Sequence, residues 1–219
     1  MAPGELVTLF GTHIGPAALA GLRPDGNGKV DTNIAGARVI FDNTPAPMIY
    51  ASDGQTSAVV PYETADHASA RVRVEYQGIR SAAVTVPVVS AAPGIFSQNQ
   101  SGAGPGAILN EDSSANNSAN PAAKGSYVSL FATGEGQTDP AGIDGAVAVG
   151  PPPRPKLTVT ATAGGIPADV QYAGDAPGMV AGVLQFNVRI PDDAPSGGLP
   201  IVIKVGDASS SPNVTVAVR

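Results

Sequence analysis

The second half of this chain repeats the first half, and this repeat constrains the fold more than any other feature. Three segments of the first half return in the second half in the same order, displaced by 121, 122 and 130 residues. Ordered matches at nearly constant spacing indicate two copies of one fold in tandem. The matched pairs are 4–10 with 125–131, 45–51 with 167–173, and 84–88 with 214–218.

Alternation of apolar and polar residues indicates that each copy is built of short β-strands. Residues 70–76 (ARVRVEY) carry a charged side chain at every second position, so one face of the strand lies in water and the other in a core. The 27 glycines and 21 prolines are dispersed between apolar segments, as turns between short strands require. The expected strands are 5–10, 37–41, 47–51, 56–60, 70–76 and 82–88, then 126–132, 157–161, 168–172, 183–190, 200–205 and 213–218.

This density of short strands predicts an all-β fold of two tandem immunoglobulin-like antiparallel β-sandwich domains. We expect the first sandwich over residues 1–91 and the second over 92–219, with an N-terminal hairpin and linker at 92–124. A domain of about 100 residues buries enough surface to fold without a metal or a disulfide. The chain has no cysteine with which to form a disulfide.

Charge and hydropathy exclude two classes of partner. The formal net charge is −6 and the Lys and Arg residues are scattered singly, so we expect no nucleic-acid partner. No apolar stretch approaches the ~20 residues of a membrane-spanning helix, so we expect no membrane insertion. The chain begins almost directly on a predicted strand, from which we expect it to be part of a longer exported protein, extracellular or at the cell surface.

No catalytic constellation stands out in the sequence. The two histidines, His13 and His67, have no neighbouring His or Cys, and no Gly-x-Ser-x-Gly segment is present. A triad assembled from distant residues stays open at this point. We nevertheless expect a protein that is not an enzyme, with no catalytic residues and no cofactor.

Residues 25–31 (DGNGKVD) are the sharpest local motif. Asp25, Asn27 and Asp31 place oxygen-bearing side chains at alternate positions around glycines, as a calcium-binding loop does. Lys29 occupies another of the alternate positions, where its ammonium repels a cation, and no Glu closes the loop at its twelfth place. The motif therefore favours a hairpin turn, and Asp25, Asn27 and Asp31 are kept as calcium candidates.

Two further segments each allow a structural and a functional interpretation. Residues 151–155 (PPPRP) favour an extended polyproline segment, either a linker or a ligand for an aromatic groove. Around residues 173–180 the repeat offset grows from 122 to 130, so the second copy carries an insertion there. Its apolar Met179 and Val180 either meet a partner or, as we expect, pack against the first domain.

Six blocks of sequence occur in order at residues 3–7, 44–50, 91–96, 106–110, 132–136 and 187–191. Together they resemble the uncharacterised acidobacterial C-terminal domain family that is often called the Solibacter C-terminal domain. The resemblance covers nearly the whole chain and implies a module at the end of long exported proteins, related to the IPT/TIG type of immunoglobulin-like domain. That family has no established activity, so the resemblance implies no functional residues.

Three functions remain open. The leading hypothesis is a structural or display module of a surface protein whose partner is the rest of the parent protein. The second is an adhesion or binding module for a glycan or a protein ligand, which would use loops at one end of a sandwich. The third is a self-assembling fibre subunit, in which the edge strand of one chain is completed by the next, and the oligomeric state is left open.

Overall fold

The computed structural model describes residues 1–25 and 27–219, and these residues form an all-β protein. The only helical element within them is a single 3₁₀ turn, η1 (Tyr62–Thr64). The all-β prediction is confirmed. No helix in these two ranges is long and apolar enough to span a membrane.

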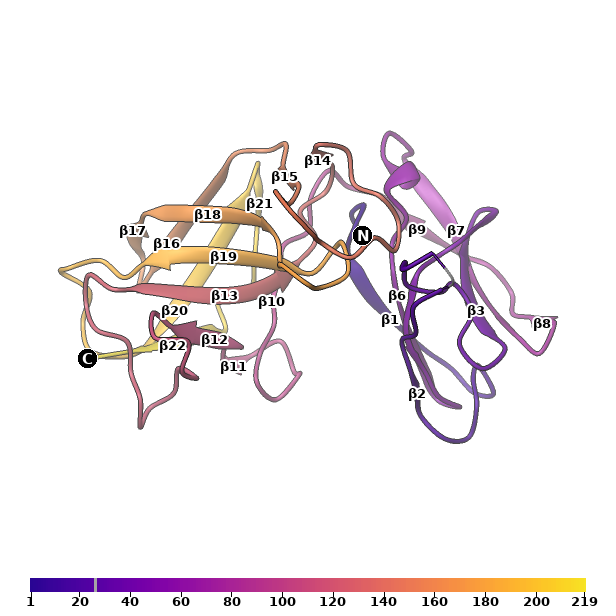
Figure 1. Ribbon diagram of the computed structural model, residues 1–219, viewed down its shortest axis with the longest axis horizontal. Helices are drawn as coiled ribbons and strands as arrows, with labels where there is room; N and C mark the ends of the chain where they lie inside the picture. The colour runs from indigo at the N-terminus through magenta and orange to yellow at the C-terminus, as the bar shows by residue number, and fades with distance from the viewer. Residues whose placement is uncertain (26) are drawn as a thin grey trace.

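Residues 1–90 form two antiparallel sheets, and each contains residues of the predicted strands (Figure 1). The first sheet has the order β1-β6-β5-β2, and the second has the order β4-β3-β7-β8, with β9 also paired to β7. Their bounds are β1 Leu6–Phe10, β2 Ala20–Gly21, β3 Ala37–Phe41, β4 Thr44–Pro45, β5 Met48–Ala51, β6 Gln55–Val59, β7 Ser69–Tyr76, β8 Ile79–Arg80 and β9 Val84–Pro87.

Residues 91–219 form two larger sheets and a short two-stranded one. The larger sheets have the orders β10-β13-β19-β18, with β12 also on β13, and β11-β22-β20-β16-β17, with β21 also on β20; β14 pairs with β15. The bounds are β10 Gly94–Ile95, β11 Gly104–Pro105, β12 Ile108–Asn110, β13 Tyr127–Thr133, β14 Thr138–Asp139, β15 Arg154–Pro155, β16 Val159–Ala163, β17 Ile166–Ala168, β18 Val170–Asp175, β19 Leu184–Arg189, β20 Gly197–Val205, β21 Ala208–Ser209 and β22 Val214–Val218.

Strand pairing repeats between the halves, as the sequence repeat requires. The order β1-β6-β5 returns as β13-β19-β18, and β3-β7-β9 returns as β16-β20-β22. The small strands return too, because β4 pairs with β3 as β17 pairs with β16. Even the β-bulge between Met48 and Tyr50 recurs between Val170 and Tyr172.

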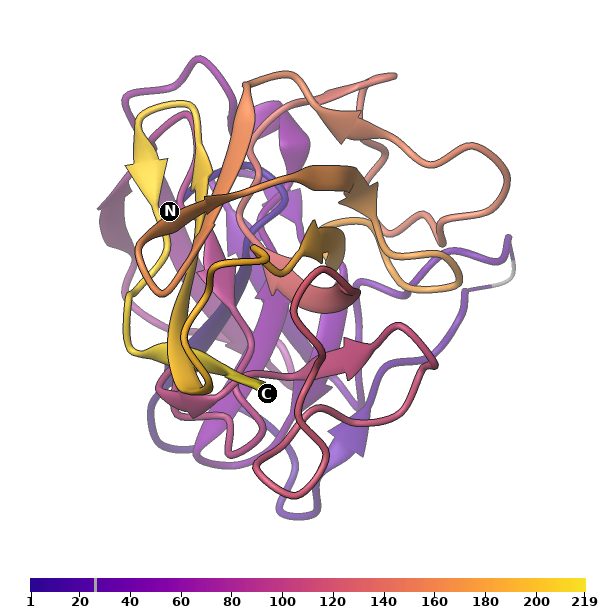
Figure 2. The same cartoon turned by 90° about the vertical axis from the view of Figure 1, so that its left-hand side faces the viewer.

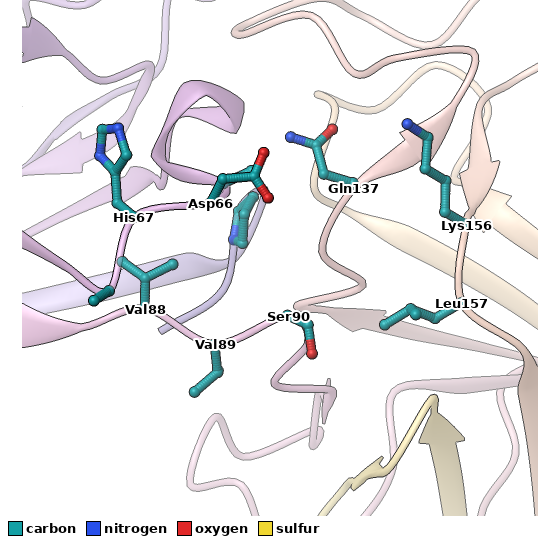
Figure 3. A pocket seen from close by; sticks show the side chains of 11 residues that line it. Asp66, His67, Val88, Val89, Ser90, Gln137, Lys156 and Leu157 are labelled. Carbon is teal, nitrogen blue, oxygen red and sulfur yellow. The ribbon is translucent and has the colours of Figure 1, made fainter.

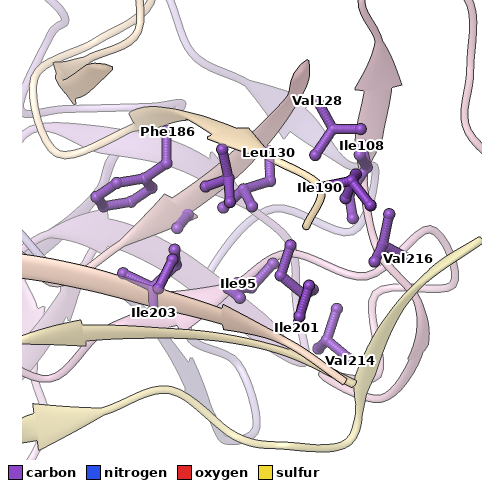
Figure 4. Packing of buried hydrophobic residues seen from close by; sticks show 14 of the residues in the cluster. Ile95, Ile108, Val128, Leu130, Phe186, Ile190, Ile201, Ile203, Val214 and Val216 are labelled. Carbon is purple, nitrogen blue, oxygen red and sulfur yellow. The ribbon is translucent and has the colours of Figure 1, made fainter. Parts of the chain in front are cut away.

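Each half has its own buried apolar cluster. In residues 1–90 the cluster includes Phe41 and Met48, and in residues 91–219 it includes Leu130, Phe186 and Ile201 (Figure 4). Separate cores are what two tandem domains need. The assignment of both halves as immunoglobulin-like, and the boundaries 1–91 and 92–219, stay predictions. The two halves lie side by side along the longest axis, and Figure 2 looks along this axis with the second half in front.

The segment before the second half's first long strand contains the predicted hairpin contact and further strand pairings. Ser97 bridges Gly106 in the antiparallel sense, as the predicted hairpin requires. However, β10 and β12 both lie against β13, and β11 lies parallel to β22. This segment is therefore part of both larger sheets of the second half.

Candidate functional site

The joint between the two halves is organised around Tyr62, which follows Pro61 at the start of η1. The Tyr62 ring lies between Gly4 and Gly142, where an added Cβ would come within 2.9 Å and 2.4 Å of ring atoms. Only glycine at both positions lets the backbone approach an aromatic ring this closely. The Tyr62 residue is 5% exposed.

Three hydrogen bonds tie Tyr62 to the second half. Its hydroxyl donates to Oε1 of Glu135 at 3.0 Å, and its backbone N–H donates to Oδ1 of Asp144 at 2.9 Å. Its carbonyl oxygen accepts from Nε2 of Gln137 at 2.9 Å. One residue of the first half is thus held by three side chains of the second, which fixes both its position and its orientation.

Backbone and apolar contacts extend the joint on either side of Tyr62. The Leu6 N–H donates to Oγ1 of Thr133 at 2.8 Å, and the Val30 N–H donates to the Gly145 carbonyl at 2.8 Å. Val180, from the inserted segment 173–180, packs with Val30 and Val59. The insertion therefore contributes to the joint, as expected, and the binding role suggested for its apolar residues reduces to Met179, which is 48% exposed.

Two carboxyl groups are buried in the joint without full hydrogen bonding. Glu135 is completely buried and its Oε2 has no partner, while Asp175 is 1% exposed and its Oδ1 has none. Burial raises the pKa of Glu135 to about 8, although its own backbone N–H and the Tyr62 hydroxyl oppose the shift. Burial likewise raises the pKa of Asp175 to about 6. Because desolvation penalises the charged form, Glu135 is mostly uncharged at neutral pH.

A cleft of about 740 Å³ opens beside the joint, with walls from both halves. Figure 3 shows Asp66 and His67 on one side and Gln137 and Lys156 on the other, above a floor that includes Val89. Carboxylate, imidazole, amide and ammonium groups face one space there. This combination can hydrogen-bond a polar ligand that touches both halves at once.

A second, more apolar groove of about 580 Å³ runs between β1 and β9 in the first half. Phe41, Val72 and Val74 of the core contribute to its lining. Phe10 and Val84 also line the groove and are 78% and 64% exposed. Sequence reasoning did not identify either cavity, because both depend on which strands the fold leaves uncovered.

The calcium candidates are engaged by their own turns. Oδ1 of Asp25 accepts from the N–H groups of Asn27 and Lys29 at 2.7 Å and 2.9 Å, and these bonds lower the pKa of Asp25. Oδ1 of Asp31 accepts from the Asn33 N–H at 3.0 Å. Gly26 of this motif lies outside the described residues. Over residues 1–25 and 27–219, no three His, Cys, Asp or Glu side chains are grouped so as to hold a metal ion. Calcium binding stays a prediction about these three residues.

Each histidine has a carboxylate nearby. Nδ1 of His13 lies 3.0 Å from Oδ1 of Asp53, and Nδ1 of His67 lies 3.9 Å from Oδ2 of Asp42. Both pairs are on the surface, so water competes for each interaction. The proline-rich segment 151–155 leads into β15, and the guanidinium of Arg154 lies 5.9 Å from the centroid of the Tyr172 ring.

Comparison with known proteins gives no family. No family model matches the chain, and no curated protein matches it. Among solved structures, the chain is similar to SGBP-B of the mixed-linkage glucan utilization locus of Bacteroides ovatus, in complex with a mixed-linkage heptasaccharide, at 13% identity and a TM-score of 0.33. It is also similar to SGBP-B from a complex xyloglucan utilization locus in Bacteroides uniformis, at 13% identity and a TM-score of 0.30.

Both similarities cover nearly all of this chain, 100% and 98%, but the chain spans only 43% and 45% of those proteins. Similarities of this size carry no argument about function. What the protein does must therefore be inferred from its own joint, cleft and edges.

Proposed function

We propose that the chain is a non-enzymatic structural module of an extracellular or cell-surface protein, which holds the parts on either side of it at a fixed separation. In this proposal the chain consists of two tandem immunoglobulin-like domains and is related to the Solibacter-type C-terminal family and to IPT/TIG domains. Its partner is the rest of a parent protein. The joint around Tyr62 carries it, because a buried residue whose hydroxyl and backbone make three hydrogen bonds across the joint resists bending there. Most contacts between domains are more polar and looser than a core, so domain motion would otherwise be expected.

The experiment measures the distance between the halves in solution. Because the chain has no cysteine, Ile79→Cys on β8 and Ser196→Cys before β20 give two exposed sites for spin labels. Double electron–electron resonance should give one narrow distance distribution for the native joint. Tyr62→Ala should broaden it, because the ring and all contacts of its hydroxyl are lost.

Phe10→Ala is the matched control. It also removes an aromatic ring, but from an exposed position outside the joint, and it should leave the distribution unchanged. A native distribution as broad as that of Tyr62→Ala would show that the joint bends freely and would refute the spacer function.

The cleft beside the joint supports a second candidate, an adhesion module for a glycan or a protein ligand. Its polar groups come from both halves, so one ligand would bridge them and further fix the joint. A glycan array followed by titration calorimetry tests this directly. Lys156→Ala and Asp66→Asn should weaken any binding at least tenfold, whereas Lys204→Ala, an exposed lysine on β20, should not. Binding that ignores the first two substitutions would place the ligand elsewhere.

A further inference from the structure

The second half of the chain covers an opening that the first half leaves uncovered. In the second half, the segment 94–122 fills the space between the edges of β13 and β22. Its strands β10 and β12 pair antiparallel with β13, and β11 pairs parallel with β22. The corresponding edges of the first half are β1 and β9. No further strand of the described chain joins β1 on its free side, and the apolar groove lies between these two edges.

Met1 occupies the position in the first half that Ala122 occupies at the end of the covering segment. Ala122 ends the covering segment: its N–H donates to the Ala217 carbonyl, and its own carbonyl accepts from the Arg219 N–H, each at 2.9 Å. Met1 repeats this geometry, because its amino group donates to the Pro87 carbonyl at 3.0 Å and its carbonyl accepts from the Val89 N–H at 2.9 Å. The displacements are those of the sequence repeat, 121 for 1 to 122 and 130 for 87 to 217.

Side chains at matched positions are more buried in the second half, where the covering segment is present, than in the first half. Val214 is 1% exposed in the second half, whereas its counterpart Val84 is 64% exposed. Leu130 is completely buried, whereas its counterpart Leu9 is only partly buried. The difference arises from Ile95 and Ile108 of the covering segment, which pack into the second core beside Leu130 and Val214 (Figure 4). Nothing within the described residues plays their part in the first half.

We propose that the groove between β1 and β9 is an acceptor site for a strand-forming polypeptide segment with the chemistry of residues 94–121. The segment runs parallel to β9 from the position beside Val84 toward Met1, and it pairs antiparallel with β1. It places two β-branched or aliphatic side chains inward, where Ile95 and Ile108 lie in the second half. β11 pairs with residues 214–215 and β12 with residues 128–130. By the sequence repeat, we expect the bound segment to pair with Val84 and Thr85 on one side and with residues 7–9 on the other.

The groove itself selects this occupant. Two edge strands flank it, and edge strands bind extended peptides through their free N–H and C=O groups while alternate side chains enter pockets. Its lining contains no Asp or Glu, and Arg73 is the one charged residue. An uncharged segment with alternating apolar residues therefore fits. A helix would leave the main-chain groups of both edges unpaired, and an acidic peptide would bury carboxylates against the apolar lining.

The test uses the chain's own covering segment as a tethered probe. A second copy of residues 92–121 is fused directly before Met1, which reproduces the connection that the second half has at Ala122. Hydrogen–deuterium exchange of the amides in β1 and β9 is then compared with the unfused chain. We expect exchange at Thr8, Phe10 and Thr85 to slow at least tenfold, because these amides gain strand partners.

The matched control carries Ile95→Asn and Ile108→Asn in the fused copy only, so length and linker stay the same while the inward apolar side chains are lost. Equal exchange in the probe and control fusions would overturn the proposal. Sedimentation equilibrium of the unfused chain provides a second check. A dimer that dissociates on Val84→Ser, with β1 and β9 already protected in the native chain, would show that a second copy occupies the groove and would equally overturn it.

Discussion

Removal of the Tyr62 hydroxyl is expected to weaken the joint by an amount that depends on pH. Tyr62→Phe keeps the ring between Gly4 and Gly142 and removes only the donor to Glu135. A hydrogen bond between neutral groups contributes about 1 kcal/mol, and one to a charged group about 1.5–3 kcal/mol. The pKa of Glu135 is about 8. The substitution should therefore lower the free energy of unfolding by about 1 kcal/mol at pH 6 and by about 2–3 kcal/mol at pH 9.

The native protein has its own pH dependence, with a definite sign. Burial raises the pKa of Glu135 from 4.5 to about 8, so the folded state holds the proton more tightly than the unfolded chain. The stability contributed by this group is fully present below pH 4.5 and is lost as the pH rises to about 8. The loss amounts to about 5 kcal/mol if nothing relaxes. Asp175, whose pKa is raised to about 6, adds to the decline at lower pH.

Urea denaturation at pH 6 and pH 9 tests both statements in four proteins: native, Tyr62→Phe, Glu135→Gln and the double variant. Glu135→Gln keeps an acceptor for the Tyr62 hydroxyl but cannot ionise, so Tyr62→Phe should cost about 1 kcal/mol in that background at both pH values. Glu135→Gln should also abolish most of the decline in stability above pH 6. If Tyr62→Phe costs the same at both pH values in the native background, Glu135 does not ionise in the joint and the reasoning fails.

Three further outcomes are expected. Gly142→Ala puts a Cβ 2.4 Å from the Tyr62 ring and should lower the free energy of unfolding by about 1–3 kcal/mol, as measured in a thermal melt. Gly21→Ala is the control and should change the free energy of unfolding little, because a Cβ there has no atom within 4 Å. Equal effects of the two substitutions would refute the close packing around Tyr62. Leu130→Ala should lower the free energy of unfolding by about 2–5 kcal/mol and Leu9→Ala by less, because only Leu130 is completely buried. A denaturant titration in which Leu9→Ala is the more destabilising would contradict the uncovered groove in the first half. Calcium at about 1 mM should leave the Tm unchanged, since Asp25 already accepts two backbone hydrogen bonds, and a rise that Asp25→Asn abolishes would establish a calcium site.

The strand framework was predictable from the sequence because its signals are local or repeated. Alternation in residues 70–76 predicts β7 at Ser69–Tyr76, and the displaced matches predict that β13 repeats β1. Every strand expected from alternation has a counterpart in the structure. The strands that were not predicted, such as β8, β15 and β17, have two or three residues each, too few for a periodic pattern to appear.

The joint and the groove could not be predicted, because each depends on residues far apart in the chain. Nothing near Tyr62 in the sequence indicates that Glu135, 73 positions away, accepts its hydrogen bond. Glu135 lies in a Gly-rich segment whose local sequence predicts a turn, and its hydrogen-bond donor comes from the other half of the chain. The insertion 173–180 was visible as a change of offset, but its contact with Val30 and Val59 required the fold.

The two buried carboxyl groups, Glu135 and Asp175, distinguish this joint from a purely apolar contact. A buried carboxyl with an unpartnered oxygen costs free energy, and a purely apolar contact of similar size would be at least as stable. The joint already contains such a contact in Val30, Val59 and Val180. The pKa of Glu135 is raised to about 8 and that of Asp175 to about 6. The strength of the joint therefore depends on pH around these values, whereas the apolar contact does not respond to pH. We therefore expect the joint to be strongest in acid, where both carboxyl groups are uncharged.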